Sequence, residues 1–245
     1  MNISLAAEPI FELGGVAITN SMFTSFLLYT SLISFAFYFS TKKIDFVPKG
    51  KSLQNLLEVI TEGLLGLFRS AAGDKARHFF PLAASFFVVI LLGSWTGLLP
   101  GFGTIGIKEE LHGTVELIPI FRGATADINT TLALALISVG AIQYYGIKSM
   151  GANYLQKFFT LKNPIHTFVG LLEFISEFAK IISFAFRLFG NIFAGEVLLT
   201  VIGTMIPFLA SLPFIGLEIF VGFIQSLVFV MLTLVFLKLA VEAHH

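Results

Sequence analysis

The sequence contains no cysteine and little charge. Asp, Glu, Lys and Arg make up 12% of its 245 residues, whereas an average soluble domain has roughly 25%. The lack of Cys excludes disulfide bonds, thiolate metal sites and cysteine nucleophiles. Fifteen basic residues balance fifteen acidic ones, so nothing indicates nucleic-acid binding. The sequence also lacks phosphate-binding loops, metal-ligand spacings and Ser/His/Asp arrangements, so we expect no cofactor and no metal.

Hydrophobic residues dominate what remains. They form 56% of the chain, Phe alone contributes 29 residues, and the mean hydropathy is +0.90. This composition predicts an all-α, polytopic integral membrane protein with one membrane domain, residues 1–245. Its length allows about five membrane-crossing helices of roughly 20 residues plus one interfacial helix.

The distribution of charge predicts where the membrane helices lie. Three spanning helices are expected at 22–40, 80–99 and 127–148, where charges are nearly absent. Pro207 and Pro213 divide the last hydrophobic region into two long helices, 164–206 and 214–241. The first of these exceeds the roughly 20 residues that cross a bilayer, so it must tilt strongly or leave the membrane.

A sixth segment, 51–70, has an amphipathic pattern. Leucines, Ile60 and Phe68 recur at helical spacing among Glu58, Glu62 and Arg69. We expect this helix to lie at the membrane interface.

Basic residues predict the orientation of the chain. Seven lie between the first and second spans and three follow the third, whereas the acidic connection 100–126 holds only Lys108 and Arg122. Because basic loops remain inside, the N-terminus should lie outside and the C-terminus inside.

Arg187 is the most informative charge. It lies in SFAFRLFGNIFAGEVLL, far from any predicted interface. A charge at this depth costs about 2.5 kcal/mol or more, and a guanidinium cannot lose its proton. Arg187 should therefore face water or a partner, or else pair with a Glu on a neighbouring helix as a purely structural arginine.

Other polar groups surround this arginine. Seven lie on one broad side of the helix: Glu173, Ser176, Glu177, Lys180, Ser183, Arg187 and Asn191. We interpret Glu177 and Lys180 as a simple salt-bridged turn. Glu196 points away from Arg187, because nine residues make about two and a half helical turns and so place it on the opposite side of the axis. Glu218 and Gln225 share one face of the last helix, a pattern typical of a narrow polar path.

Asp127 allows two interpretations. The segment Thr125-Ala126-Asp127-Ile128-Asn129 opens the third span, and Asp is a good N-cap. The alternative is a polar entrance from the outer side.

These residues together resemble a known family, subunit a of F-type ATP synthases of the bacterial type. The strongest match is Arg187-Leu188-Phe189-Gly190-Asn191, continuing to Ala194-Gly195-Glu196. The segment around Asp127, the upstream polar groups and Gln225 seven residues after Glu218 extend it from about 80 to 245. The N-terminal third matches only in layout.

The resemblance implies a non-catalytic, proton-translocating stator subunit. Arg187 is then the essential arginine facing a carboxylate of the rotating c-ring, with no bond-forming active site in this chain. The outer half-channel is expected to comprise Asn191, Glu196, Glu218, Gln225, Asp127 and Asn129, and the inner one Glu173, Ser176 and Ser183. Many relatives place a His with a Glu at the Glu196 and Glu218 positions; here both are acidic.

The resemblance also implies the surroundings of the chain. Expected partners are the c-ring, the peripheral-stalk subunit b, the lipid bilayer and protons, in a bacterial plasma membrane rather than a thylakoid. The last two helices are expected to lie strongly tilted against the ring. Two alternatives are a self-contained, proton-coupled secondary transporter, which also uses broken helices and midplane charges, and a purely structural membrane scaffold.

Overall fold

A computed structural model describes residues 7–13, 16–42, 53–99, 102, 105–111, 114–151, 154, 158, 164–205 and 211–242. The helices are α1 (Asn20–Ser40), α2 (Leu53–Ala72), the 3-10 helix η1 (Gly73–Lys75), α3 (Ala76–Thr96), α4 (Ile128–Met150), α6 (Pro164–Met205) and α7 (Ser211–Val241). Two antiparallel hairpins join β1 (Pro9–Leu13) to β2 (Val16–Thr19) and β3 (Gly106–Leu111) to β4 (Thr114–Pro119).

The described residues contain five helical segments that are long and apolar enough to cross a membrane. They are α1, the run formed by α2 and α3, α4, α6 and α7. This confirms the expected all-helical, multi-pass membrane protein whose last two helices are the long ones. The two hairpins are short additions that the hydropathy pattern did not predict.

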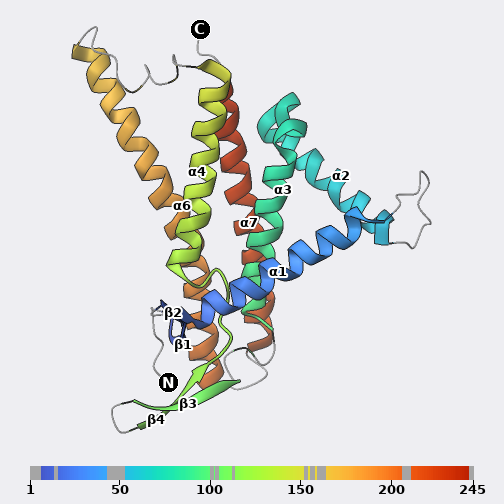
Figure 1. Cartoon of the computed structure of the whole chain (residues 1–245), viewed down its shortest axis with the longest axis vertical. Helices are drawn as coiled ribbons and strands as arrows, with labels where there is room; N and C mark the ends of the chain where they lie inside the picture. Colours follow the sequence, from blue (N-terminus) through green and yellow to red (C-terminus); the bar gives the residue numbers. More distant parts are fainter. Residues whose placement is uncertain are drawn as a thin grey trace.

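The helices form a bundle with distinct ends (Figure 1). α3, α4 and α7 run side by side, α6 packs on α4 and α7, and α1 crosses in front of α3. Both hairpins lie at one end of the bundle and the C-terminus lies at the other. This placement agrees with the predicted odd number of crossings.

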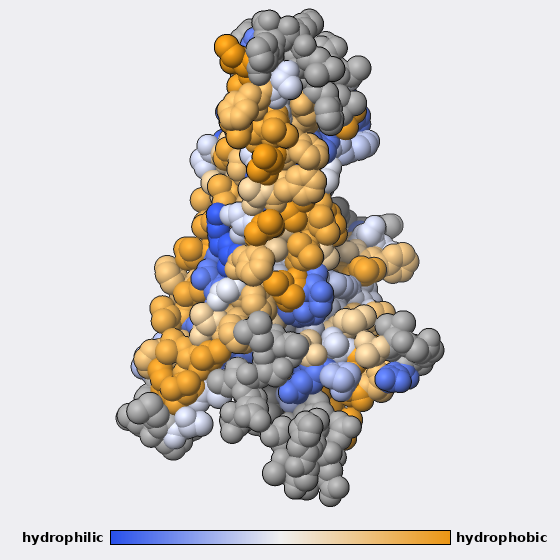
Figure 2. All heavy atoms as spheres, turned by 90° about the vertical axis from the view of Figure 1, so that its left-hand side faces the viewer, coloured by the Kyte–Doolittle hydropathy of each residue, from blue (hydrophilic) through white to orange (hydrophobic). Residues whose placement is uncertain are grey.

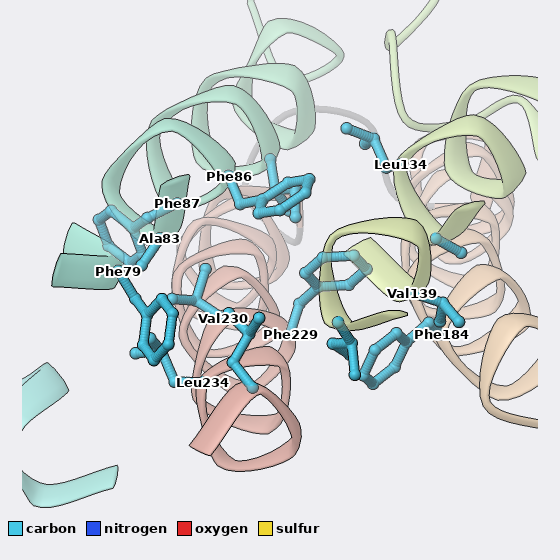
Figure 3. Close-up of a cluster of buried hydrophobic side chains, with 14 of the residues drawn as sticks. Phe79, Ala83, Phe86, Phe87, Leu134, Val139, Phe184, Phe229, Val230 and Leu234 are labelled. Carbon is cyan, nitrogen blue, oxygen red and sulfur yellow. The ribbon is translucent and has the colours of Figure 1, made fainter. Parts of the chain in front are cut away.

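Aromatic residues fill the centre of the bundle (Figure 3). Phe86 of α3 and Phe184 of α6 both pack against Phe229 of α7, with ring centroids 5.6 and 5.0 Å apart. Ser138 of α4 and Thr233 of α7 share a buried hydrogen bond of 2.8 Å. The core thus fixes α6 and α7 against a rigid support.

Some helix ends differ from the sequence prediction. α3 begins at Ala76 rather than 80 and ends at Thr96 rather than 99. Pro81 lies in the second turn of α3, where it removes the bond to a first-turn carbonyl and its ring crowds that carbonyl. Gly73, with φ of +60°, separates α2 from α3. Residues 51, 52 and 206 of the predicted ranges, and Pro207, lie outside the described residues.

α6 is the longest element. Its 42 residues correspond to roughly 63 Å of helix, about twice the hydrocarbon thickness of roughly 30 Å. In Figure 1 it leans away from α4 toward the end that carries the C-terminus. α7 begins at Ser211, three residues before the predicted start, because Pro213 fits within a first turn.

Candidate functional site

Arg187 lies near the middle of α6 and its side chain is exposed. Its Nη2 donates a hydrogen bond of 3.1 Å to Ser183 Oγ, one turn earlier. Within the described ranges, no carboxylate forms an ion pair with this guanidinium. The alternative of a structural arginine paired inside the chain therefore finds no support.

The surface beside Arg187 is open. A Cβ placed on Gly190 would meet no atom within 4 Å, and Ala194 is also exposed. Phe186, next to the arginine, is 57% exposed. Seen from the α6 side, the surface is a mainly hydrophobic column with hydrophilic patches near mid-height (Figure 2). This face combines a cation with room for a second helix.

Asn191 and Gln225 connect α6 to α7. Asn191 Nδ2 donates a hydrogen bond of 2.7 Å to Gln225 Oε1. Gln225 is buried, and its Nε2 has no hydrogen-bond partner in the described part of the chain. A buried amide of this kind usually binds water.

Glu218 on α7 contacts the backbone of α6. Its buried side chain places the carboxyl group directly against Gly195, where any Cβ would overlap it. Because glycine has no Cβ, the carboxyl group can occupy this space against the backbone of α6. Glu218 therefore lies beside the residue that precedes Glu196.

Glu196 forms an ion pair that the sequence analysis missed. Arg122 Nη2 lies 3.4 Å from Glu196 Oε2. Arg122 is buried, with 7% of its side chain exposed, while 39% of Glu196 is exposed. In the sequence, Arg122 indicated only the orientation of the chain. A basic residue five positions before Asp127, in a connection that is acidic apart from Lys108, was the available signal.

Asp127 caps α4. Its Oδ1 accepts hydrogen bonds from the backbone N (3.1 Å) and side-chain Nδ2 (3.2 Å) of Asn129. Its Oδ2 accepts a bond of 2.9 Å from Ser21 Oγ of α1. The capping interpretation is confirmed, and the additional contact brings α1 to the start of α4.

The first turn of α1 holds the segment before α4. Asn20 Nδ2 donates to the carbonyl oxygen of Pro119 (3.2 Å), and the backbone N of Arg122 donates to Thr24 Oγ1 (3.3 Å). Asn20, Ser21 and Thr24 are all buried. Asn20 and Ser21 precede the predicted start of the helix at 22, and the sequence pattern did not single out any of the three residues.

The predicted inner residues lie on α6 before Arg187. Ser183 contacts the arginine, and Ser176 Oγ donates to the carbonyl oxygen of Glu173 (2.9 Å). Ser176 is exposed and Glu173 is half-buried. These three residues therefore lie before Arg187 along the axis of α6, whereas Asn191 and Glu196 lie after it.

Glu177 and Lys180 form the expected salt bridge. Lys180 Nζ lies 2.7 Å from Glu177 Oε1, and Gln143 Nε2 of α4 donates to Glu177 Oε2 at 2.8 Å. The prediction of a salt-bridged turn is thus confirmed, with an added contact to α4.

Tyr154, in the connection between α4 and α6, joins this group. Its hydroxyl donates to Gln143 Oε1 at 2.9 Å. Burial, followed by the nearby carboxylates of Glu177 and Glu173, raises the pKa of Tyr154 to about 12. Its hydroxyl therefore stays neutral at physiological pH.

Among the described residues, no group of three or more His, Cys, Asp or Glu could hold a metal.

Comparison with known proteins gives one consistent family. The family described as ATP synthase A chain matches residues 22–238. The chain is 30% identical to ATP synthase subunit a of Moorella thermoacetica over 236 residues, which covers 96% of each protein. It is 34% identical to ATP synthase subunit a of Syntrophobacter fumaroxidans over 207 residues, covering 84% of this chain and 78% of the relative.

Proposed function

The chain belongs to the ATP synthase A chain family, and on that premise we propose that Arg187 and two flanking half-channels couple proton flow to rotation of a c-ring. The chain is then the proton-translocating stator subunit of the membrane sector. Its relatives are subunits of a complex, so the alternatives of a self-contained transporter and a passive scaffold are set aside. Bond-forming chemistry belongs to other subunits.

The exposed position of Arg187 is the observation that carries this proposal. A permanent cation in a hydrophobic helix requires an anion or water. In the described part of the chain no acid pairs with it, and Gly190 and Ala194 leave space beside it. A ring carboxylate on a neighbouring helix fits both the charge and the space.

The outer half-channel follows the contact between α6 and α7. Glu218 of α7 contacts Gly195 of α6, which directly precedes Glu196. Farther along the same contact, Gln225 of α7 accepts a hydrogen bond from Asn191 of α6. The unpartnered Nε2 of buried Gln225 favours water in this path. Asp127 and Asn129 belong at its entrance, at the end of the bundle that carries the hairpins.

The inner half-channel lies on the other side of Arg187. Glu173, Ser176 and Ser183 provide polar groups along the preceding turns of α6. Ser183 touches the arginine directly, so a proton released near Arg187 meets this series of polar groups first.

The physical cycle follows from these charges. A proton from the outer side neutralises a ring carboxylate, which then enters lipid at low cost. After nearly a full rotation the site loses its proton to the inner half-channel, and the new carboxylate is attracted to Arg187. Because Arg187 keeps its charge, protons cannot pass directly between the half-channels. The membrane potential supplies about 2.3 kcal/mol per charge per 100 mV.

The partners follow from the same proposal. The open face of α6 receives the c-ring, and subunit b of the peripheral stalk holds the chain against rotation. The protein is multi-pass, and its bacterial relatives favour the plasma membrane as its location.

The decisive experiment replaces Arg187 in the whole complex. Arg187→Ala should abolish coupled ATP synthesis and ATP-driven proton pumping in reconstituted vesicles, while the complex still assembles. Arg77→Ala, which removes another exposed arginine from α3, is the matched control and should retain both activities. Coupled synthesis by assembled Arg187→Ala complexes contradicts the proposal.

A further inference from the structure

We propose that Arg122 is a positioning residue that holds Glu196 in the outer half-channel. This inference rests on the proposed function, since it gives Glu196 a role in proton uptake. It adds a residue from the connection before α4 to a path otherwise built from α6, α7 and the start of α4.

The ion pair is asymmetric in its exposure. Arg122 is 7% exposed and Glu196 is 39% exposed. A buried guanidinium cannot escape its desolvation cost by losing a proton, so it needs a carboxylate nearby. The buried partner therefore acts as the fixed support, and the accessible partner is the group that is held.

The support is anchored outside α6. The backbone N of Arg122 donates to Thr24 Oγ1 at 3.3 Å, and Thr24 Oγ1 in turn donates to the carbonyl oxygen of Asn20 at 3.0 Å. The backbone of Arg122 is thus tied to the start of α1 and its side chain to α6, so the residue links the two helices. Without that bridge, a half-exposed glutamate would sample several rotamers.

The geometry leaves one oxygen of Glu196 available. Arg122 contacts Oε2, and among the described residues no hydrogen bond or ion pair is recorded for Oε1. Holding one oxygen fixes where the other can accept a proton. Since proton transfer needs hydrogen-bond distance, displacement of about 1 Å is enough to slow it.

The ion pair between Arg122 and Glu196 is a single contact between Nη2 and Oε2. It does not use the two-pronged geometry that only a guanidinium provides. An ammonium on a stem of similar length can make the same contact with Oε2, so lysine should preserve the ion pair with Glu196. If Arg122 only filled space, any side chain of similar size would serve instead.

The experiment compares four variants in the complete complex, reconstituted in vesicles. These are Arg122→Gln, Arg122→Lys, Glu196→Gln and the double variant Arg122→Gln, Glu196→Gln. The readout is the rate of ATP synthesis driven by an imposed proton gradient, normalised to the amount of assembled complex. Arg77→Gln is the control for loss of an arginine elsewhere.

The expected result is a double-mutant cycle with full coupling. Arg122→Gln lowers the rate about tenfold, equal to about 1.4 kcal/mol, and Arg122→Lys stays within about twofold of wild type. In the Glu196→Gln background, the further change Arg122→Gln has no effect. An unchanged rate for Arg122→Gln, or an equal loss with and without Glu196, overturns the inference.

The outcomes separate this inference from the proposed function. If Glu196→Gln retains the wild-type rate, the outer-path assignment itself is wrong and the inference falls with it. If Glu196→Gln is slow while Arg122→Gln is not, only the inference fails. Should Arg122→Gln not assemble, the Lys variant decides: assembled but slow Arg122→Lys complexes overturn the role proposed for the charge.

Discussion

Asn191 on α6 donates a hydrogen bond of 2.7 Å to Gln225 on α7, one helical turn beyond Arg187. The pair links the two longest helices next to the exposed cation. It also leaves Gln225 Nε2 buried and without a partner in the described part of the chain. The point where α6 and α7 join is therefore also a point that favours water.

Breaking this pair should slow proton flow. Gln225→Leu removes both the accepting oxygen and the group that favours water, and it leaves Asn191 Nδ2 without its partner. Losing this hydrogen-bonding group should raise the activation barrier by about 1.4 kcal/mol, which corresponds to about a tenfold lower rate of ATP synthesis. Leu227→Ala, a change at a half-buried apolar residue on the same helix, is the control for general damage to α7. Equal rates for Gln225→Leu and wild type contradict the role of the pair.

The two acids of the outer path should act together. We expect Glu196→Gln, Glu218→Gln to slow proton uptake more than either single change, because each carboxylate can accept and release a proton. The measurement is the pH–rate profile of ATP synthesis in vesicles. A profile that matches wild type in the double variant argues against these residues as the path.

A side chain added at Gly195 should displace the carboxyl group of Glu218. In Gly195→Ala, the new Cβ overlaps the carboxyl group of Glu218 and must displace it. Because the displaced group is the end of a flexible side chain, we expect little change in thermal unfolding but slower ATP synthesis. Gly140→Ala on α4 is the matched control, because a Cβ there meets no atom within 4 Å. Equal behaviour of the two alanine variants would show that Glu218 is not confined.

Tyr154 should ionise only in strong alkali. With its pKa raised to about 12 by burial and by the Glu177 and Glu173 carboxylates, the folded state retains the phenolic proton more tightly than the unfolded state. Stability from this group is present below about pH 10 and is lost as the pH rises toward 12. Tyrosinate absorbance should show a late phase that Tyr154→Phe removes. In Glu177→Gln this phase should move to lower pH, and an unmoved phase would exclude the effect of that carboxylate.

The membrane helices were predictable because burial in lipid imposes long uncharged runs. The division between α6 and α7 followed from Pro207 and Pro213, and the end of α2 fell within two residues of its prediction. The predicted start of α3 at 80 was four residues late, because the span was placed where charges are absent, whereas the first turn of the helix includes Arg77.

The site was only partly readable from the sequence. Helical spacing alone placed Arg187 and Glu196 on different sides of α6, and Ser183 beside the arginine. Arg122 and Glu196 are 74 residues apart, so no local period relates them. The same is true of Ser21 and Asp127, whose contact depends on how α1 crosses the bundle. Such pairs depend on tertiary packing.

The grip of α1 on the segment before α4 has a consequence for protein engineering. Asn20, Ser21 and Thr24 each form a hydrogen bond with that segment, so α1 and residues 119–127 should be exchanged together. Hybrids between relatives should work only when α1 and residues 119–127 come from the same parent.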